Sequence, residues 1–374
     1  MLHIRRGHFD GMKTLVVTAS TLALALLAAL GWFMLTPDPL GGEPYALLSL
    51  EGSSRPDARP KIVTSRSGGE AQTKQTPAEG GKKADTRAPG SVTLVANDAP
   101  IVLPDVPVRA LVENSRYGPL PKIAEDGRKP SEVYARPTRV AALPEQGEPA
   151  RIAILITGLG LSEQITTEAI TKLPPEISLA FSPYGSNLQS WVRQARGAGH
   201  EVMLQLPLEP FDYPDNDPGP QTLLTSLSPE ENKKRLLWLL ARFTGYTGVT
   251  NHMGAKFVAA QEAFLPVLEE LRSRGLIYVD DGTAARSAAG AIARDLGLGF
   301  TAAHLQIDVG GTPDAIDEAL EKLETMSRET GLAIGVGTSL PVTIARLSAW
   351  ARGLADKGII LVPVSAAVLA RQAS

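Results

Sequence analysis

The sequence contains no cysteine, few aromatic residues and no large excess of either charge. Without cysteine the chain has no disulfides, no thiolate metal ligands and no cysteine nucleophile. The net charge of -3, and the lack of basic stretches interleaved with aromatics, give no attraction to a phosphate backbone, so nucleic acid is not expected as a partner. No P-loop and no G-x-S-x-G nucleophile elbow occurs.

One long apolar segment stands near the N-terminus. Residues 15–35 are 21 consecutive uncharged, mostly apolar positions, which as a helix span about 30 Å, the thickness of a bilayer's hydrocarbon core. Arg5, Arg6 and Lys13 precede this segment and Asp38 follows it, so residues 1–14 are expected in the cytoplasm. We expect a single-pass anchor in the inner (cytoplasmic) membrane with the C-terminal part outside the cytoplasm; a cleaved signal peptide is the alternative.

Residues 36–149 are expected to form a disordered linker. They are rich in proline, glycine and serine, with 16 prolines from residue 37 onward, and this composition cannot build a core. As flexible coil the linker reaches about 60 Å. Residues 120–137 are less polar, because Leu120, Ile123, Val133 and Tyr134 lie among them, and they are candidates for docking on the domain that follows.

Residues 150–374 are expected to form one α/β domain, because short apolar runs alternate there with helical patterns. The expected strands are residues 152–157, 177–181, 201–206, 248–251, 276–280, 332–337 and 359–364. One expected helix begins at Ser162, and the others cover residues 229–243, 261–274, 313–329 and 342–357. This alternation predicts a parallel sheet, most simply an incomplete (β/α) barrel. A doubly wound open sheet is the alternative.

In both architectures a ligand meets the C-terminal ends of the strands. The residues that follow the expected strands are Thr157, Gly158, Gln205, Glu209, Asn251, His252, Asp280, Asp281, His304, Asp308 and Thr338. A long loop at 207–226 brings Phe211, Asp212 and Tyr213 over the same end, where an aromatic platform beside acidic groups suits a sugar ring. Gly158 and Gly160 lack the third glycine of a dinucleotide loop, so a nicotinamide cofactor is not expected.

Six segments resemble the divergent polysaccharide deacetylase family. In order they are AILITGLGLS, GHEVMLQLPLEP, DPGPQTLLT, GVTNHMGAKF, YVDDGT and AIGVGTSLP, and the resemblance covers roughly residues 150–370. It implies an incomplete (β/α) barrel and the chemistry of esterases that remove N-acetyl groups from glycans with a divalent metal, commonly zinc. There a metal polarises the acetyl carbonyl and activates water, a carboxylate accepts the proton, and an acid protonates the leaving amine.

The positions that carry this chemistry in the family are only partly kept. The family's acidic pair after the first strand falls on Thr157 and Gly158, and two of its histidines fall on Gln205 and Thr338. A catalytic zinc typically needs three protein ligands and an open fourth position, and hydroxyl or amide oxygens are poor substitutes for imidazole or carboxylate. The inherited site is therefore expected to be dismantled.

Ligand-type residues remain at two family positions, His252 and Asp280. The candidate catalytic residues are His252, Asp280 and Asp281, and the candidate ligands of a rearranged metal site are His252, Asp280 and His304. The candidate substrate-binding residues are Asn251, Gln205, Asp212 and Tyr213. Convergence of three ligand-type side chains, each about 2 Å from a common point, favours an enzyme, whereas Thr157, Gln205 and Thr338 lining the site favour binding alone.

Two functions follow as hypotheses. The first is a catalytically reduced, membrane-anchored domain that binds an N-acetylated glycan, such as a polysaccharide or peptidoglycan, or an envelope protein. The alternative is an active metal-dependent polysaccharide N-deacetylase with a rearranged site. No cofactor is required by the first hypothesis, and zinc or another divalent metal belongs to the second.

Overall fold

The computed structural model describes residues 94–95, 101–139 and 149–372 of the chain. The expected membrane helix at 15–35 and most of the expected linker lie outside these residues. No helix among the described residues has the length and apolar character to cross a membrane. Every described residue belongs to one compact unit, Lys82–Ser374.

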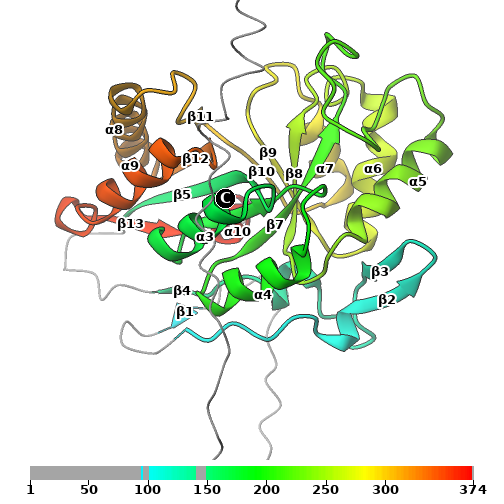
Figure 1. Cartoon of the computed structure of the whole chain (residues 1–374), viewed down its shortest axis with the longest axis horizontal. Helices are drawn as coiled ribbons and strands as arrows, with labels where there is room; N and C mark the ends of the chain where they lie inside the picture. Colours follow the sequence, from blue (N-terminus) through cyan, green and yellow to red (C-terminus); the bar gives the residue numbers. More distant parts are fainter. Residues whose placement is uncertain (1–93, 96–100, 140–148, 373–374) are drawn as a thin grey trace, which may run out of the picture. The chain divides into compact units, whose positions relative to one another are not determined.

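A curled parallel sheet forms the centre of the domain (Figure 1). Its strand order is β10-β9-β8-β7-β6-β5-β12-β11, and β13 also pairs with β5. The described strands of this sheet are β5 (Ala150–Leu159), β6 (Ser178–Phe181), β7 (Val202–Leu208), β8 (Gly248–Met253), β9 (Ile277–Asp280), β10 (Phe300–Ala302), β11 (Leu305–Gln306), β12 (Leu332–Thr338) and β13 (Ile359–Val362). All of their pairings are parallel.

The two end strands of the sheet, β10 and β11, are neighbours in the chain. Only Ala303 and His304 separate them, and the three Cα–Cα steps between the strands span at most about 11 Å. The amide of Ala303 donates to the carbonyl of Asp280 (2.9 Å), and the amide of His304 donates to that of Ile334 (2.8 Å). The sheet must curl for so short a link to join its two edges. The predicted incomplete (β/α) barrel is confirmed, and the open doubly wound sheet is not the architecture.

The barrel has an apolar core on each side of its sheet. Ile152, Ile154 and Ile156 of β5 pack outward against the helices, whereas Ala153 and Leu155 face the inside of the curl. Successive strand residues point to opposite faces, so burial of both faces requires the unbroken apolar sequence found here. The helices that follow the strands are α3 (Glu163–Lys172), α4 (Leu188–Gly197), α5 (Pro229–Leu240), α6 (Gln261–Ser273), α7 (Ala289–Leu296), α8 (Pro313–Thr330) and α9 (Pro341–Ala351).

The C-terminal helix α10 (Val364–Gln372) packs inside the curl, where Val364 and Val368 join the inner cluster. The amide of Val364 donates to the hydroxyl of Ser178 (3.1 Å) at the start of β6, and β13 pairs with the first half of β5. The helix therefore lies at the N-terminal ends of the strands. The C-terminal ends of the strands therefore remain available for a functional site.

Residues 101–139, inside the range expected to be linker, pack against the barrel. Leu111, Leu120 and Tyr134 are buried, and Arg196 of α4 donates to the carbonyl of Tyr134 (2.8 Å) and lies over its ring. The described elements here are η1 (Arg109–Leu111), β2 (Val112–Ser115), β3 (Gly118–Pro121), α2 (Pro130–Val133), and β1 (Leu94–Val95), which pairs with β4 (Thr138–Arg139). This segment is part of the folded unit.

One buried glutamate joins this segment to the barrel and to α10. Glu201, directly before β7, is fully buried, and its carboxyl group accepts hydrogen bonds from the amides of Arg136 and Ser365 (3.1 Å each) and from the hydroxyl of Ser178 (3.3 Å). Burial raises the pKa of Glu201, and these hydrogen bonds offset only part of that effect.

The raised pKa of Glu201 makes stability depend on pH. Between the ordinary value of 4.5 and the raised value, the folded state holds a proton that the unfolded state releases, so the free energy of unfolding falls as pH rises through that interval. We expect Glu201→Gln to flatten this fall in urea unfolding measured from pH 5 to pH 8. Glu321→Gln, at an exposed position of α8, should follow the unmodified chain. An unchanged slope in Glu201→Gln would contradict the assignment.

Candidate functional site

The C-terminal ends of the strands form what we call the barrel mouth, defined by Thr157, Gln205, His252, Asp281 and Thr338. Thr157, Gln205, Asp281 and Thr338 each lie two positions after an inward-facing residue of the preceding strand. His252 lies two positions after a buried threonine of β8. Alternation along the strands therefore turns all five toward the inside of the curl. The structure thus brings together five of the residues singled out in the sequence.

The two threonines of the mouth already have hydrogen-bond partners within the protein. Thr157 and Thr338 are register partners on β5 and β12, and the hydroxyl of Thr157 donates to the carbonyl of Gly337 (3.1 Å). Oδ2 of Asp308 accepts from the amide (2.7 Å) and hydroxyl (2.6 Å) of Thr338 and from the hydroxyl of Thr343 (2.9 Å). Asp308 therefore ties the segment after β11 to β12 and α9, and these groups brace the mouth.

Gln205 bridges strands that are not neighbours. Its Oε1 accepts a hydrogen bond from the amide of Gly158 (2.7 Å), although β6 lies between β5 and β7. Gly158 has a φ of +83°, and a Cβ there would lie 3.2 Å from the hydroxyl of Ser339, so the position favours glycine. The Nε2 amino group of Gln205 has no hydrogen-bond partner among the described residues. It remains a donor for a ligand.

His252, near the end of β8, is exposed, and its ring has no hydrogen-bond partner in the described part of the chain. The protein around it nevertheless displaces enough water to lower the pKa of the imidazole. A lowered pKa keeps the ring neutral at neutral pH, so it offers one donor and one acceptor nitrogen. His252 is the member of the mouth whose polar atoms are least engaged.

The aspartates after β9 are engaged in their own loop. The carboxylate of Asp280 accepts from the amide of Gly282 (2.9 Å) and the hydroxyl of Ser287 (2.6 Å). Oδ1 of Asp281 accepts from the amide (2.9 Å) and hydroxyl (2.7 Å) of Thr283. Burial raises the pKa of Asp281, against the opposing effect of these bonds. By strand alternation Asp280 belongs to the outward face, whereas Asp281 faces the mouth.

Two further candidate site residues, Asn251 and His304, hold parts of the sheet and its loops in position. Oδ1 of Asn251 accepts from the hydroxyl of Tyr278 (3.1 Å), a residue of the outer core, and from the amide of Asp281 (2.9 Å). Nδ1 of His304 accepts from the amide of Ile334 (2.9 Å), whose carbonyl in turn accepts from the amide of His304. Asn251 therefore positions the loop after β9, and His304 positions the short link between β10 and β11.

These positions do not fit a catalytic zinc. Across the residues that the structure describes, no three histidine, aspartate or glutamate side chains lie together as metal ligands. By strand alternation Asp280 belongs to the outward face, and Nδ1 of His304 accepts from the amide of Ile334, so neither side chain stands with His252 as one of the further ligands that a catalytic zinc needs. We therefore derive no catalytic step through a metal.

The loop at 207–226, which follows β7, is anchored at both ends by Glu209. This buried carboxylate accepts from the amide (2.5 Å) and hydroxyl (2.7 Å) of Thr225 and pairs with Lys256 (2.7 Å). Burial alone would raise the pKa of Glu209, but the bonds from Lys256 and Thr225 outweigh it and lower the pKa. Of the two candidates in this loop, Asp212 accepts a hydrogen bond from a nearby asparagine of the loop and Tyr213 is half-buried.

Exposed apolar side chains follow the strand ends around the mouth. Five of the six exposed large hydrophobic residues in the described part of the chain lie after β5, β7, β11 and β12 or at the end of β8. They are Leu161, Phe211, Met253, Val309 and Leu340, with exposed fractions between 38% and 80%. We call these five residues the apolar rim. The mouth therefore combines polar groups inside with apolar side chains around them.

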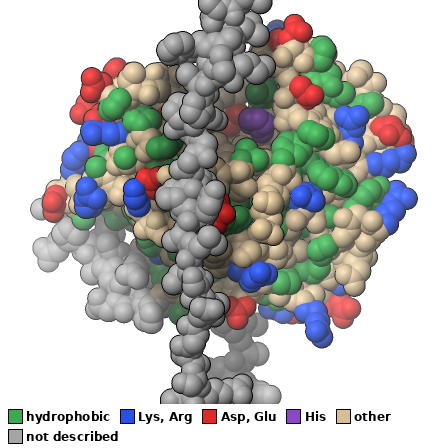
Figure 2. Space-filling view, viewed as in Figure 1, with side chains coloured by type: hydrophobic (Ala, Val, Ile, Leu, Met, Phe, Trp, Pro, Cys, Tyr) green, Lys and Arg blue, Asp and Glu red, His purple; other side chains and the backbone are tan. Residues whose placement is uncertain are grey.

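The apolar rim escaped the sequence reasoning, which searched the strand ends for polar residues. A usable signal is present, because Leu161, Val309 and Leu340 are single large apolar residues flanked by glycine, serine, aspartate or proline, two or three positions after a strand. The distribution of charged side chains gives no comparable signal for a binding site. In the coloured part of the face shown in Figure 2, acidic and basic side chains lie among hydrophobic ones without a stripe of one sign.

The comparisons with known proteins fit this geometry. The model of the divergent polysaccharide deacetylase family matches residues 154–368, which is more than half of the chain. The chain belongs to this family. An uncharacterized protein of Agrobacterium tumefaciens C58 has a crystal structure similar to this domain, with 41% identity over 67% of this chain and 99% of that one and a TM-score of 0.63.

Two curated relatives are more distant. An uncharacterized protein of Haemophilus influenzae is 25% identical over 209 residues, which is 55% of this chain and 73% of the relative. The uncharacterized protein YibQ of Escherichia coli K12 is 22% identical over 194 residues, which is 52% of this chain and 60% of YibQ. Neither relative's name states a function.

Glu209 offers a test of how the overhanging loop is held. We expect Glu209→Gln to lower the free energy of unfolding by about 1–2 kcal/mol, because charge-assisted hydrogen bonds are lost while Lys256 stays partly exposed. Limited proteolysis should also cut residues 210–221 faster. Asp215→Asn, at an exposed position of the same loop, is the matched control and should change neither. Equal cleavage rates in Glu209→Gln and the unmodified chain would refute this role.

Proposed function

We propose that this domain binds an N-acetylated envelope glycan at the barrel mouth and does not hydrolyse it. The observation that carries the proposal is the set of hydrogen bonds at the family's catalytic positions. Thr157, Gln205 and Thr338 stand where the resemblance expects metal-site residues, and each is bonded to the protein's own backbone or side chains. A barrel that keeps the fold of the family, while the residues at its catalytic positions are bonded within the protein, is suited to binding a glycan without hydrolysing it.

The free polar atoms of the mouth match an N-acetyl group. Such a group presents one carbonyl acceptor and one N–H donor. Nε2 of Gln205 can donate to the carbonyl, and the neutral ring of His252 can accept from the N–H. In the register of β7 and β8, Gln205 lies opposite Thr250, and His252 follows two residues later on the same face. The two side chains therefore stand on adjacent strands within reach of one small group.

The apolar rim supports the same ligand class. An acetyl methyl group and the C–H faces of a pyranose ring are apolar, and carbohydrate sites pair them with aromatic and aliphatic side chains. Phe211, 61% exposed, and Met253 lie after or at the end of β7 and β8, the strands that carry Gln205 and His252. The guanidinium of Arg286 lies 5.9 Å from the centre of the Phe211 ring and holds one face of it.

The location proposed from the sequence is consistent with an envelope ligand. An anchor at residues 15–35 followed by a linker would hold the domain outside the cytoplasm, where wall or periplasmic polymers carry N-acetyl groups. An envelope protein bound at the apolar rim is the other occupant. A working deacetylase would require two further ligand-type side chains to come together with His252, and no such group occurs among the described residues.

The proposal predicts metal-independent binding of an N-acetylated sugar chain. We expect the full-length chain to bind a β-1,4-linked tetramer of N-acetylglucosamine in calorimetric titrations, and to bind the fully deacetylated tetramer at least about tenfold more weakly, a difference of about 1.4 kcal/mol. A chelator should leave the affinity unchanged, and no acetate should be released. Acetate release that a chelator abolishes would establish the enzyme instead.

Single substitutions separate the mouth from the rest of the surface. His252→Ala and Gln205→Glu should each weaken binding of the acetylated tetramer about tenfold, because each removes one hydrogen bond to the acetamido group. Gln205→Glu keeps the oxygen that accepts from Gly158, so its unfolding midpoint separates lost binding from lost structure. Lys322→Ala, on the exposed face of α8, is the control. Unchanged affinity in both mouth variants would reject the proposed site.

A further inference from the structure

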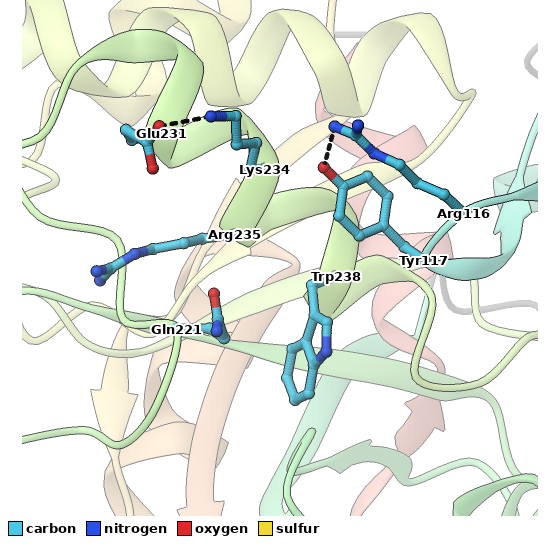
Figure 3. A pocket seen from close by; sticks show the side chains of 7 residues that line it. All are labelled: Arg116, Tyr117, Gln221, Glu231, Lys234, Arg235 and Trp238. Atoms are coloured by element: carbon cyan, nitrogen blue, oxygen red, sulfur yellow. Dashed lines mark hydrogen bonds and ion pairs between the residues drawn. The ribbon is translucent and has the colours of Figure 1, made fainter.

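A cavity lies on the helical layer, between the β2–β3 turn and α5 (Figure 3). Its volume is about 550 Å³, within the range of small-molecule sites. Arg116 and Tyr117 come from the turn, Lys234 and Trp238 from α5, and Gln221 from the end of the loop that overhangs the mouth. Residues far apart in the sequence thus build one cavity, and none of them is a mouth residue.

The cavity carries more positive than negative charge. Arg116, Lys234 and Arg235 line it together with one acid, Glu231, and that acid pairs with Lys234 (2.5 Å). Within the described part of the chain, no carboxylate pairs with either arginine. Arg116 donates to the hydroxyl of Tyr117 (2.7 Å), and Arg235 donates to a backbone carbonyl. Guanidinium groups that have neutral partners retain the capacity to bind a carboxylate.

An aromatic surface stands opposite this charge. In Figure 3, Arg116 and Lys234 lie at one side of the cavity and the indole of Trp238 lies at the other. The guanidinium of Arg242 packs over the Trp238 ring at 4.9 Å from its centre and holds the indole in place. An apolar ring surface facing cationic groups suits a ligand with one flat apolar face and one anionic substituent.

The wall that carries Gln221 is held rigidly in an uncommon conformation. Gln221 has a φ of +66°, a left-handed value that a residue with a side chain rarely adopts. The hydroxyl of Tyr184 donates to the carbonyl of Pro220 (2.6 Å), and Arg235 donates to that of Thr222 (2.5 Å), so both neighbours are fixed. Backbone strain that surrounding bonds maintain is concentrated at binding sites. Here it brings an amide side chain to the cavity.

We propose that this cavity binds an acidic sugar, a pyranose ring that carries a carboxylate. The ring lies on Trp238, the carboxylate meets the guanidinium of Arg116, and the amide of Gln221 receives ring hydroxyls. The site lies outside the barrel mouth, so it gives the chain a second point of contact with an acidic glycan. It stands on different residues from the N-acetyl site and does not depend on it.

The test compares two sugars that differ in the carboxylate. Saturation-transfer difference NMR on the full-length chain should show binding of glucuronic acid, with transfer to its ring protons, and binding of glucose at least tenfold weaker. Acetate should compete at least tenfold less well than glucuronic acid, because it lacks the ring. Equal binding of glucose, or equal competition by acetate, would overturn the assignment.

Single substitutions test whether glucuronic acid binds in this cavity. Arg116→Ala should weaken glucuronic acid binding at least tenfold, Arg116→Lys should restore part of it, and Trp238→Ala should abolish saturation transfer. Arg128→Ala, an exposed arginine of the same N-terminal segment that pairs with Asp126, is the matched control. Gln205→Glu should leave this binding intact, which separates failure here from failure at the mouth. Unchanged affinity in folded Arg116→Ala and Trp238→Ala proteins would refute the site.

Discussion

The burial of β5 on both faces is the constraint on which the rest of the domain depends. This strand pairs with β12 along one edge and with β13 and then β6 along the other, so it contacts three strands. Its outward side chains pack against the outer helices, and its inward side chains pack against α10. Because both faces are buried, the strand must be an unbroken apolar sequence. The same strand ends at Thr157 and Gly158, so the strand that organises the core also places the first residues of the mouth.

The polar side chains of the barrel mouth are held mostly by hydrogen bonds within the protein. Residues at catalytic positions would leave buried polar groups if they merely lost their ligand, and such groups are costly. Here Gln205 bonds across the curl to Gly158, and Asp308 gathers the donors of β12 and α9. These hydrogen bonds link strands and helices across the mouth. His252 and Nε2 of Gln205 are left without hydrogen-bond partners among the described residues, and the proposed recognition of an N-acetyl group rests on them.

Much of the fold could be predicted from the sequence, because hydrophobic periodicity is a local signal. The expected strands and the longer helices appear at their expected places, whereas α4, α7, α10, β10 and β11 were missed, since the helices are rich in alanine, glycine or polar residues and the strands are two or three residues long. The inward position of α10 depends on contacts with distant strands. The same limit applies to the site. Asp280 and His304 are ligand types by sequence, but their partners, Ser287 and Ile334, are set only by the folded loops and by the closure of the sheet.

The central claim is that the barrel mouth recognises an N-acetylated sugar without a metal ion. Crystals of the chain soaked with both zinc and the N-acetylglucosamine tetramer test it most directly, because anomalous scattering at the zinc edge locates the metal independently of the sugar. The account predicts sugar density against Gln205 and His252 with no anomalous peak between them. A zinc peak coordinated by His252 together with Asp280 or Asp281, beside the acetamido group, would contradict it.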